Sequence, residues 1–109
     1  MDEYLSTALD DFIGQIKNSE VYKVYYEQVK KLNNYPNLQE QVNNYRKENF
    51  EIQNTYEGDE LYDKTEEFFL KYEKFRENPI VSDFLASELA LCRMMQEIDT
   101  RIIKGLDFQ

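Results

Sequence analysis

Carboxylates are the plentiful acid–base groups of this sequence, because it contains no histidine and one cysteine. Without histidine there is no imidazole base, no serine–histidine or cysteine–histidine nucleophile pair, and few of the ligands of zinc sites. No glycine-rich phosphate loop of the Walker or dinucleotide type is present. The sequence therefore predicts no catalytic residue, no metal site and no cofactor, and it does not support an enzyme.

An acidic run is the densest group of carboxylates. It lacks the alternating oxygen ligands, central glycine and terminal glutamate of a calcium-binding loop. Acidic side chains are favourable at the N-terminal end of a helix dipole. We therefore interpret the run as the solvated start of a helix; its members are Glu57, Asp59, Glu60, Asp63, Glu66 and Glu67.

Glu88 stands out because it shares a helical stripe with Phe84 and Met95. An ionised carboxylate on an apolar stripe is costly unless it is paired. Arg46, Arg93 or a tyrosine hydroxyl could supply the partner. Alternatively, the stripe is partly open at that level. We expect a structural role in setting the packing register, with a direct binding role as the alternative.

Aromatic residues are the second anomaly, with nine tyrosines, seven phenylalanines and no tryptophan. Tyrosine combines apolar area with a hydroxyl and suits half-buried positions and protein interfaces. An aromatic-rich core is one explanation, and an aromatic surface covered by a partner is the other. The interface candidates, with Glu88 and Met95 added, are Tyr22, Tyr25, Tyr26, Phe68, Phe69, Tyr72, Glu88 and Met95.

Charge and cysteine content limit the partners and the compartment. The net charge is −9, the opposite of the basic field that phosphate backbones require, so we expect no direct nucleic-acid binding. The single Cys92 fits a reducing compartment, and its place beside the Glu88 stripe predicts a buried thiol. No apolar stretch is long enough for a membrane span, and no signal peptide is evident. We expect a cytoplasmic protein.

The segments that contain these residues are predicted to be helices. Apolar residues recur at steps of three and four, and the breaks fall at Ser19, Pro36, Gly58 and Pro79. Gly58 suits the end of one helix, and Asp59 could cap the next. We predict an all-α fold: one domain over residues 1–109, a bundle of about five helices with antiparallel packing.

The last helix, from about Pro79 to Lys104, would be about 38 Å long at 1.5 Å per residue. A helix of that length in so short a chain rarely buries its whole stripe within one subunit. Packing shared between subunits, and hence a homo-oligomer, is the expectation. A faint repeat at an offset of 43 residues aligns Pro36 with Pro79, and it is equally explained by chance agreement of amphipathic helices.

A pattern of residues runs through nearly the whole chain, and its most specific part is Asn78-Pro79 followed by Glu88. The remaining positions are Leu9, Phe12 and Ile16, then Ser19, Glu20, Tyr22 and Tyr25, then Pro36, Leu38, Val42, Tyr45 and Arg46, and last Val81, Phe84, Leu85, Leu91, Met95, Ile98 and Ile102. This pattern resembles the YlbF/YmcA family of small helical bacterial proteins, which includes YheA-like members.

The resemblance implies a self-associating helical protein that is not an enzyme. YlbF and YmcA form a complex with a third protein, YaaT, which influences competence, sporulation and biofilm formation through RNase Y or the phosphorelay. The iron–sulfur chemistry associated with that complex needs cysteines that this chain lacks. We predict a regulatory adaptor that binds proteins; the alternative is a self-assembling structural protein, as a YheA-like homo-oligomer.

Overall fold

The computed structural model describes residues 1–107, and within that range the chain forms six α-helices and no strand. This confirms the all-α prediction and the long C-terminal helix. A short helix before the last one was not expected. The helices are α1 (Glu3–Asn18), α2 (Glu20–Asn33), α3 (Pro36–Thr55), α4 (Gly58–Lys71), α5 (Glu73–Glu77) and α6 (Pro79–Gly105).

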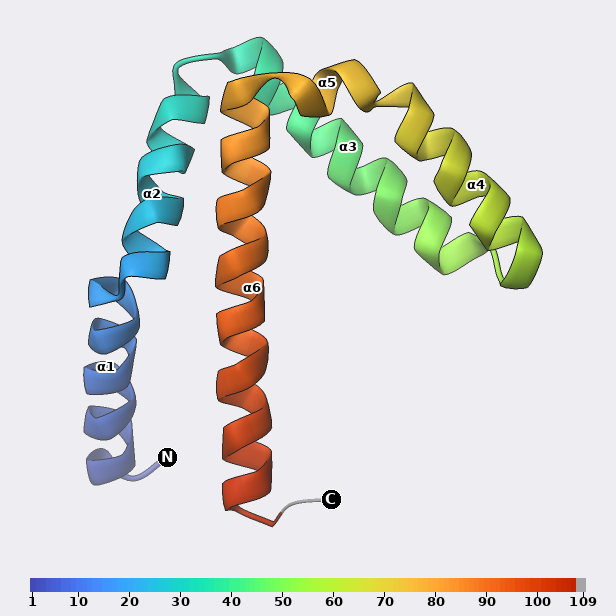
Figure 1. Cartoon of the computed structure of the whole chain (residues 1–109). Helices are drawn as coiled ribbons and strands as arrows, with labels where there is room; N and C mark the ends of the chain where they lie inside the picture. Colours follow the sequence, from blue (N-terminus) through green and yellow to red (C-terminus); the bar gives the residue numbers. More distant parts are fainter. Residues whose placement is uncertain (108–109) are drawn as a thin grey trace.

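Ser19 separates α1 from α2 without a loop. Its hydroxyl donates to the carbonyl of Ile16 at 2.6 Å and accepts from the backbone N–H of Tyr22 at 3.2 Å. Its backbone is extended, so the residue ends one helix and caps the next. The two helices consequently follow each other as one nearly continuous column (Figure 1).

Both prolines occupy the first position of a helix, where the missing N–H costs nothing. Asn78 completes the second corner, because its side-chain oxygen accepts from the N–H of Ile80 at 3.0 Å. The break between α3 and α4 falls at Gly58, which has a φ of +58°. Glycine adopts this backbone conformation without the steric cost that a side chain would add. Asp59 does not cap α4, contrary to expectation: Glu57 precedes the helix and Asp59 lies inside its first turn.

Two helix–proline–helix units interlock at these corners. The first unit is α2 with α3, and the second is α4 and α5 with α6. The first helix of each unit packs against the last helix of the other, α2 on α6 and α4 on α3. In Figure 1 the two corners meet at the top, the α3–α4 hairpin projects to one side, and α1, α2 and α6 run downward. The 43-residue offset aligns the proline corner of the first unit with that of the second.

The core lies at this apex and is small. Leu32, Val42 and Phe84 form its buried centre, and Val81 and Phe68 are also buried. No residue of α1 is buried, and the buried residues of α6 are Val81, Phe84 and Ser87, all in its N-terminal part. The radius of gyration is 17.7 Å, against about 13 Å for a compact chain of this length. The molecule is therefore open rather than a closed bundle.

Replacing Phe84, which is 3% exposed, by alanine removes the ring at the centre of the apex. We expect the free energy of unfolding to fall by about 3–5 kcal/mol, because a cavity adds to the lost burial. The matched control is Tyr62→Ala, since Tyr62 is 69% exposed and its loss should cost under about 0.5 kcal/mol. Urea titration of both variants measures the difference; equal losses would show that the apex is not the core.

Candidate functional site

An ion pair joins the two halves of the molecule. Arg46 of α3 pairs with Glu88 of α6, and both side chains are partly exposed. The Arg46 guanidinium also lies over the ring of Phe84, 5.1 Å from its centroid. Of the partners considered for Glu88, the structure selects Arg46. The pair therefore helps to fix the angle between the α3–α4 hairpin and α6.

Four aromatic rings hold α3 against α4 and α5. Tyr45 lies 4.9 Å from Phe68, 5.2 Å from Tyr72 and 5.5 Å from Phe75, measured between ring centroids. Phe68 is 4% exposed, so it belongs to the core of this chain and not to its surface. Phe68 and Tyr72 thus turn inward, although the sequence placed them among candidates for a partner surface.

Glu48 accepts hydrogen bonds from two side chains at the rim of this cluster. The Tyr72 hydroxyl donates to its carboxylate at 2.5 Å, and the Lys71 ammonium donates at 2.9 Å. The bond from Tyr72, followed by that from Lys71, lowers the pKa of Glu48 from its ordinary 4.5. The same bond to Glu48, with desolvation, raises the pKa of Tyr72 to about 12.

This arrangement opens onto a hollow between α3 and α4 of about 470 Å³. Its rim carries the carboxylates of Glu48, Glu51 and Glu67 and the ammonium groups of Lys64 and Lys71. The hollow is open and its charges are nearly balanced, so it offers no dry pocket for a small molecule.

Tyrosines of α2 divide between core and surface. Tyr25 faces α6, with its ring 5.9 Å from that of Phe84. Tyr22 and Tyr26 stack on each other at 6.3 Å, and Tyr26 is 49% exposed beneath the ammonium of Lys30. Tyr25 is therefore a packing residue, and Tyr26 remains a surface candidate.

The outward face of α4 is a surface that the sequence analysis recognised only in part. Phe69 is 53% exposed, and Tyr62 and Leu70 are 69% and 67% exposed. Tyr62 and Phe69 are seven residues apart and thus share a face, a spacing that could have identified the pair. Arg76 lies over Phe69, 3.9 Å from its centroid, and holds that ring in place.

A second exposed face runs along α1 and the C-terminal half of α6. Met95 was predicted, and it is 43% exposed. The other exposed apolar residues of this face are Leu5, Leu9, Phe12 and Ile13 on α1, with Ile102 and Ile103 on α6; each is between 39% and 56% exposed. Helical spacing predicts such stripes, but it does not show how much of each side chain the rest of the chain covers.

Cys92 is exposed, which corrects the expectation of a buried thiol. It lies on α6 beyond Ser87, the last buried residue of that helix. The sequence placed Cys92 beside the stripe, but it did not show where along α6 the buried part of that stripe ends.

Comparison with known families adds one decisive observation. Residues 7–107 match the family described as "Control of competence regulator ComK, YlbF/YmcA". The chain belongs to the YlbF/YmcA family. The match covers all six helices except the first residues of α1. No curated protein and no solved structure shows significant similarity to it.

Across residues 1–107, no cluster of three or more histidine, cysteine, aspartate or glutamate side chains has an arrangement suited to a metal ion. None of the helices in that range combines the length and the apolar character of a membrane span. Membership of a regulatory family and two exposed apolar faces direct attention to protein binding.

The Glu48–Tyr72 hydrogen bond makes stability depend on pH. Because the folded state favours ionised Glu48, the stability it adds is present above pH 4.5 and is lost as pH falls through the lowered pKa. Because the folded state favours neutral Tyr72, its contribution is present below pH 10 and is lost as pH rises through about 12. Tyr72→Phe should therefore lose less stability than the unmodified protein between pH 7 and pH 3.

Denaturant titrations at the two pH values measure this effect, with the exposed Tyr62→Phe as the control that should behave like the unmodified protein. Equal acid sensitivity of Tyr72→Phe and the unmodified protein would show that the hydrogen bond does not form in solution.

Proposed function

We propose that this protein is a non-enzymatic regulatory adaptor that acts in the cytoplasm by binding other proteins. The observation that carries the proposal is the exposed outward face of α4, in a chain whose family is described by control of the competence regulator ComK. The resemblance suggests YlbF-, YmcA- or YaaT-like partners. Modulation of RNase Y or of the phosphorelay, in competence, sporulation or biofilm control, is the corresponding process.

The α4 face, defined as Asp59, Tyr62, Asp63, Glu66, Phe69 and Leu70, has a chemistry that suits a protein partner. Successive positions lie 100° apart around a helix, which brings these six residues to one side. Three are large apolar side chains and three are carboxylates. Lys64 and Lys71 lie at the hollow on the α3 side. The face therefore fits a partner segment that combines apolar anchors with lysine or arginine.

Removing the aromatic anchors together, as Tyr62→Ala with Phe69→Ala, should weaken partner binding at least tenfold, because buried aromatic anchors carry most of the energy of such interfaces. The measurement is a quantitative pulldown from native cytoplasm with mass spectrometry. Tyr35→Ala, an exposed aromatic between α2 and α3 that is not an interface candidate, is the matched control and should retain the partner.

Charge provides an independent check of the same surface. Glu66→Lys should weaken capture, and raising the salt concentration should weaken it for the unmodified protein, because opposite charges attract less when screened. Capture that survives both the double alanine variant and Glu66→Lys would remove the α4 face from the proposal. The absence of any specific partner would leave the second candidate, a self-assembling helical protein of the YheA-like kind.

A further inference from the structure

Arg46 and Glu88 meet at the edge of the buried apex, between the α3–α4 hairpin and α6. Arg46 follows the buried Val42 by one helical turn on α3. Glu88 follows the buried Phe84 by one helical turn on α6. The pair therefore lies next to the core, on the side where the hairpin and α6 diverge (Figure 1).

Little else joins the hairpin to α6. α3 packs against α2 and α4, and α5 packs against α6, but within residues 1–107 neither α3 nor α4 packs extensively against α6. Among the described residues, the other ion pairs each lie inside the hairpin or inside a single helix. The Arg46–Glu88 pair is thus the charged contact between the hairpin and α6 in that part of the chain.

The hairpin is held together by its own contacts. Tyr45 of α3 lies 4.9 Å from Phe68 and 5.2 Å from Tyr72, measured between ring centroids. The Lys71 ammonium of α4 lies 2.9 Å from the carboxylate of Glu48 on α3. Because aromatic packing and an ion pair both join α3 to α4, the hairpin should keep its shape when its angle to α6 changes.

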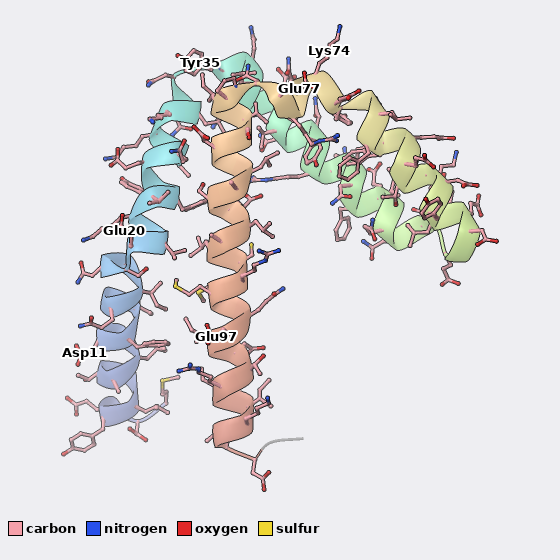
Figure 2. All side chains as sticks on the ribbon, in the orientation of Figure 1. Asp11, Glu20, Tyr35, Lys74, Glu77 and Glu97 are labelled. Carbon is pink, nitrogen blue, oxygen red and sulfur yellow. The ribbon has the colours of Figure 1, made fainter. Side chains whose placement is uncertain are left out.

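The hairpin is connected to the rest of the chain through two short corners. Tyr35 precedes α3 with φ −128° and ψ 79°, and Asn78 precedes α6 with φ −62° and ψ 121°, so neither residue is helical. Figure 2 shows Tyr35 and Glu77 at these corners, with Glu97 much farther down α6. Non-helical residues at the ends of elements are the positions that absorb the dihedral changes of a hinge.

A carboxylate is an unusual choice for the position that Glu88 occupies on α6. It shares a stripe with Phe84 and Met95, and a well-packed apolar pair is often at least as stabilising as an ion pair in such a place. The side chains of Arg46 and Glu88 are 41% and 27% exposed. Partly exposed ion pairs are weak and are screened by salt. The angle between the hairpin and α6 is therefore held by a contact that other charges can compete with.

We propose that the Arg46–Glu88 pair is a latch: when formed, it holds the α3–α4 hairpin at one angle to α6, and when a competing charge separates it, the hairpin swings as one body about the two corners. Dissolved ions, or a charged group on a bound partner, supply the competing charge. The swing changes the orientation of the α4 face relative to α2 and α6. The latch is a property of the folded chain and does not depend on the adaptor function.

The first experiment measures the distance between the hairpin tip and the far end of α6. Spin labels are attached to Glu57→Cys and Lys104→Cys, both exposed positions, in a Cys92→Ser background. The labelled chain is diluted into an excess of unlabelled protein, so that only distances within one chain are recorded. The hairpin extends about 22 Å from Val42 to its tip, so a swing of about 15° moves the tip by about 6 Å. Glu88→Gln should shift or broaden the distance distribution by about this amount.

Two variants complete this experiment. Glu97→Gln is the matched control, because Glu97 pairs with Arg101 on the same helix at 3.2 Å and should leave the distances unchanged. The exchanged pair, Arg46→Glu with Glu88→Arg, restores the attraction with its signs reversed. It should return the distribution toward that of the unmodified latch.

The second experiment requires no substitution in the latch, so it does not depend on how well the variants fold. The Debye length falls from about 30 Å at 0.01 M salt to about 3 Å at 1 M. The labelled protein with an intact latch should therefore give a narrow distance distribution at low salt and a broader one at high salt. In Glu88→Gln the distribution should already be broad at low salt and should change little. Circular dichroism at each salt concentration distinguishes a swing, which preserves the helices, from unfolding.

Three results would overturn the latch. The first is an identical distribution in the intact latch and in Glu88→Gln, and the second is an exchanged pair that fails to restore the distances. The third is a salt response that is absent, or that persists undiminished in Glu88→Gln. Partner capture plays no part in these measurements, so loss of capture in the α4 variants with unchanged distances removes only the adaptor surface.

Discussion

Phe84 of α6 packs against Tyr25 of α2 and lies beneath the guanidinium of Arg46 from α3. Three helices from different parts of the sequence thus meet on one ring. Their junction is where the two helix–proline–helix units interlock, and it contains the buried cluster of Leu32, Val42 and Phe84. This junction positions the distal parts of α2 and α6 and the α3–α4 hairpin, because helices are stiff and keep the angle at which they leave the junction.

Because the buried core is small and lies at one end of long helices, different parts of the molecule are packed to different degrees. The rings between α3 and α4 extend the packing into the hairpin, where Tyr45 contacts Phe68, Tyr72 and Phe75. Within the described residues, the C-terminal half of α6 is packed less completely, since Met95 and Ile102 are about half exposed to water. The side chains are thus well packed in the α3–α4 hairpin and less well packed along the C-terminal half of α6. An exposed apolar surface of this kind is typical of a site that another polypeptide covers.

The two exposed faces differ in chemistry. The stripes on α1 and on the C-terminal half of α6 are apolar, with the α1 carboxylates on the opposite side of the helix. The α4 face mixes aromatic residues with carboxylates, which suits a partner chosen by charge.

The sequence by itself determined the helical class, most of the helix boundaries and the need for a partner at Glu88. These are local properties: Ser19 and Asn78 cap neighbouring backbone groups, proline fits only the first turn of a helix, and Gly58 accepts a positive φ. The absence of histidine likewise restricts chemistry whatever the fold. Family membership was also readable, because the order of these elements runs through nearly the whole chain.

Tertiary structure decided which apolar residues are core. From helical spacing alone, Phe68 and Phe69 are equally good candidates for the core, yet Phe68 is 4% exposed and Phe69 is 53% exposed. The same holds for Phe84 and Met95, which are 3% and 43% exposed. The difference depends on which helix lies opposite and where that helix ends, and both are set by contacts between residues far apart in sequence. Arg46 became the partner of Glu88, and Cys92 became a surface thiol, for the same reason. An amphipathic pattern states that a face must be covered, and only the packed chain shows whether its own helices cover it.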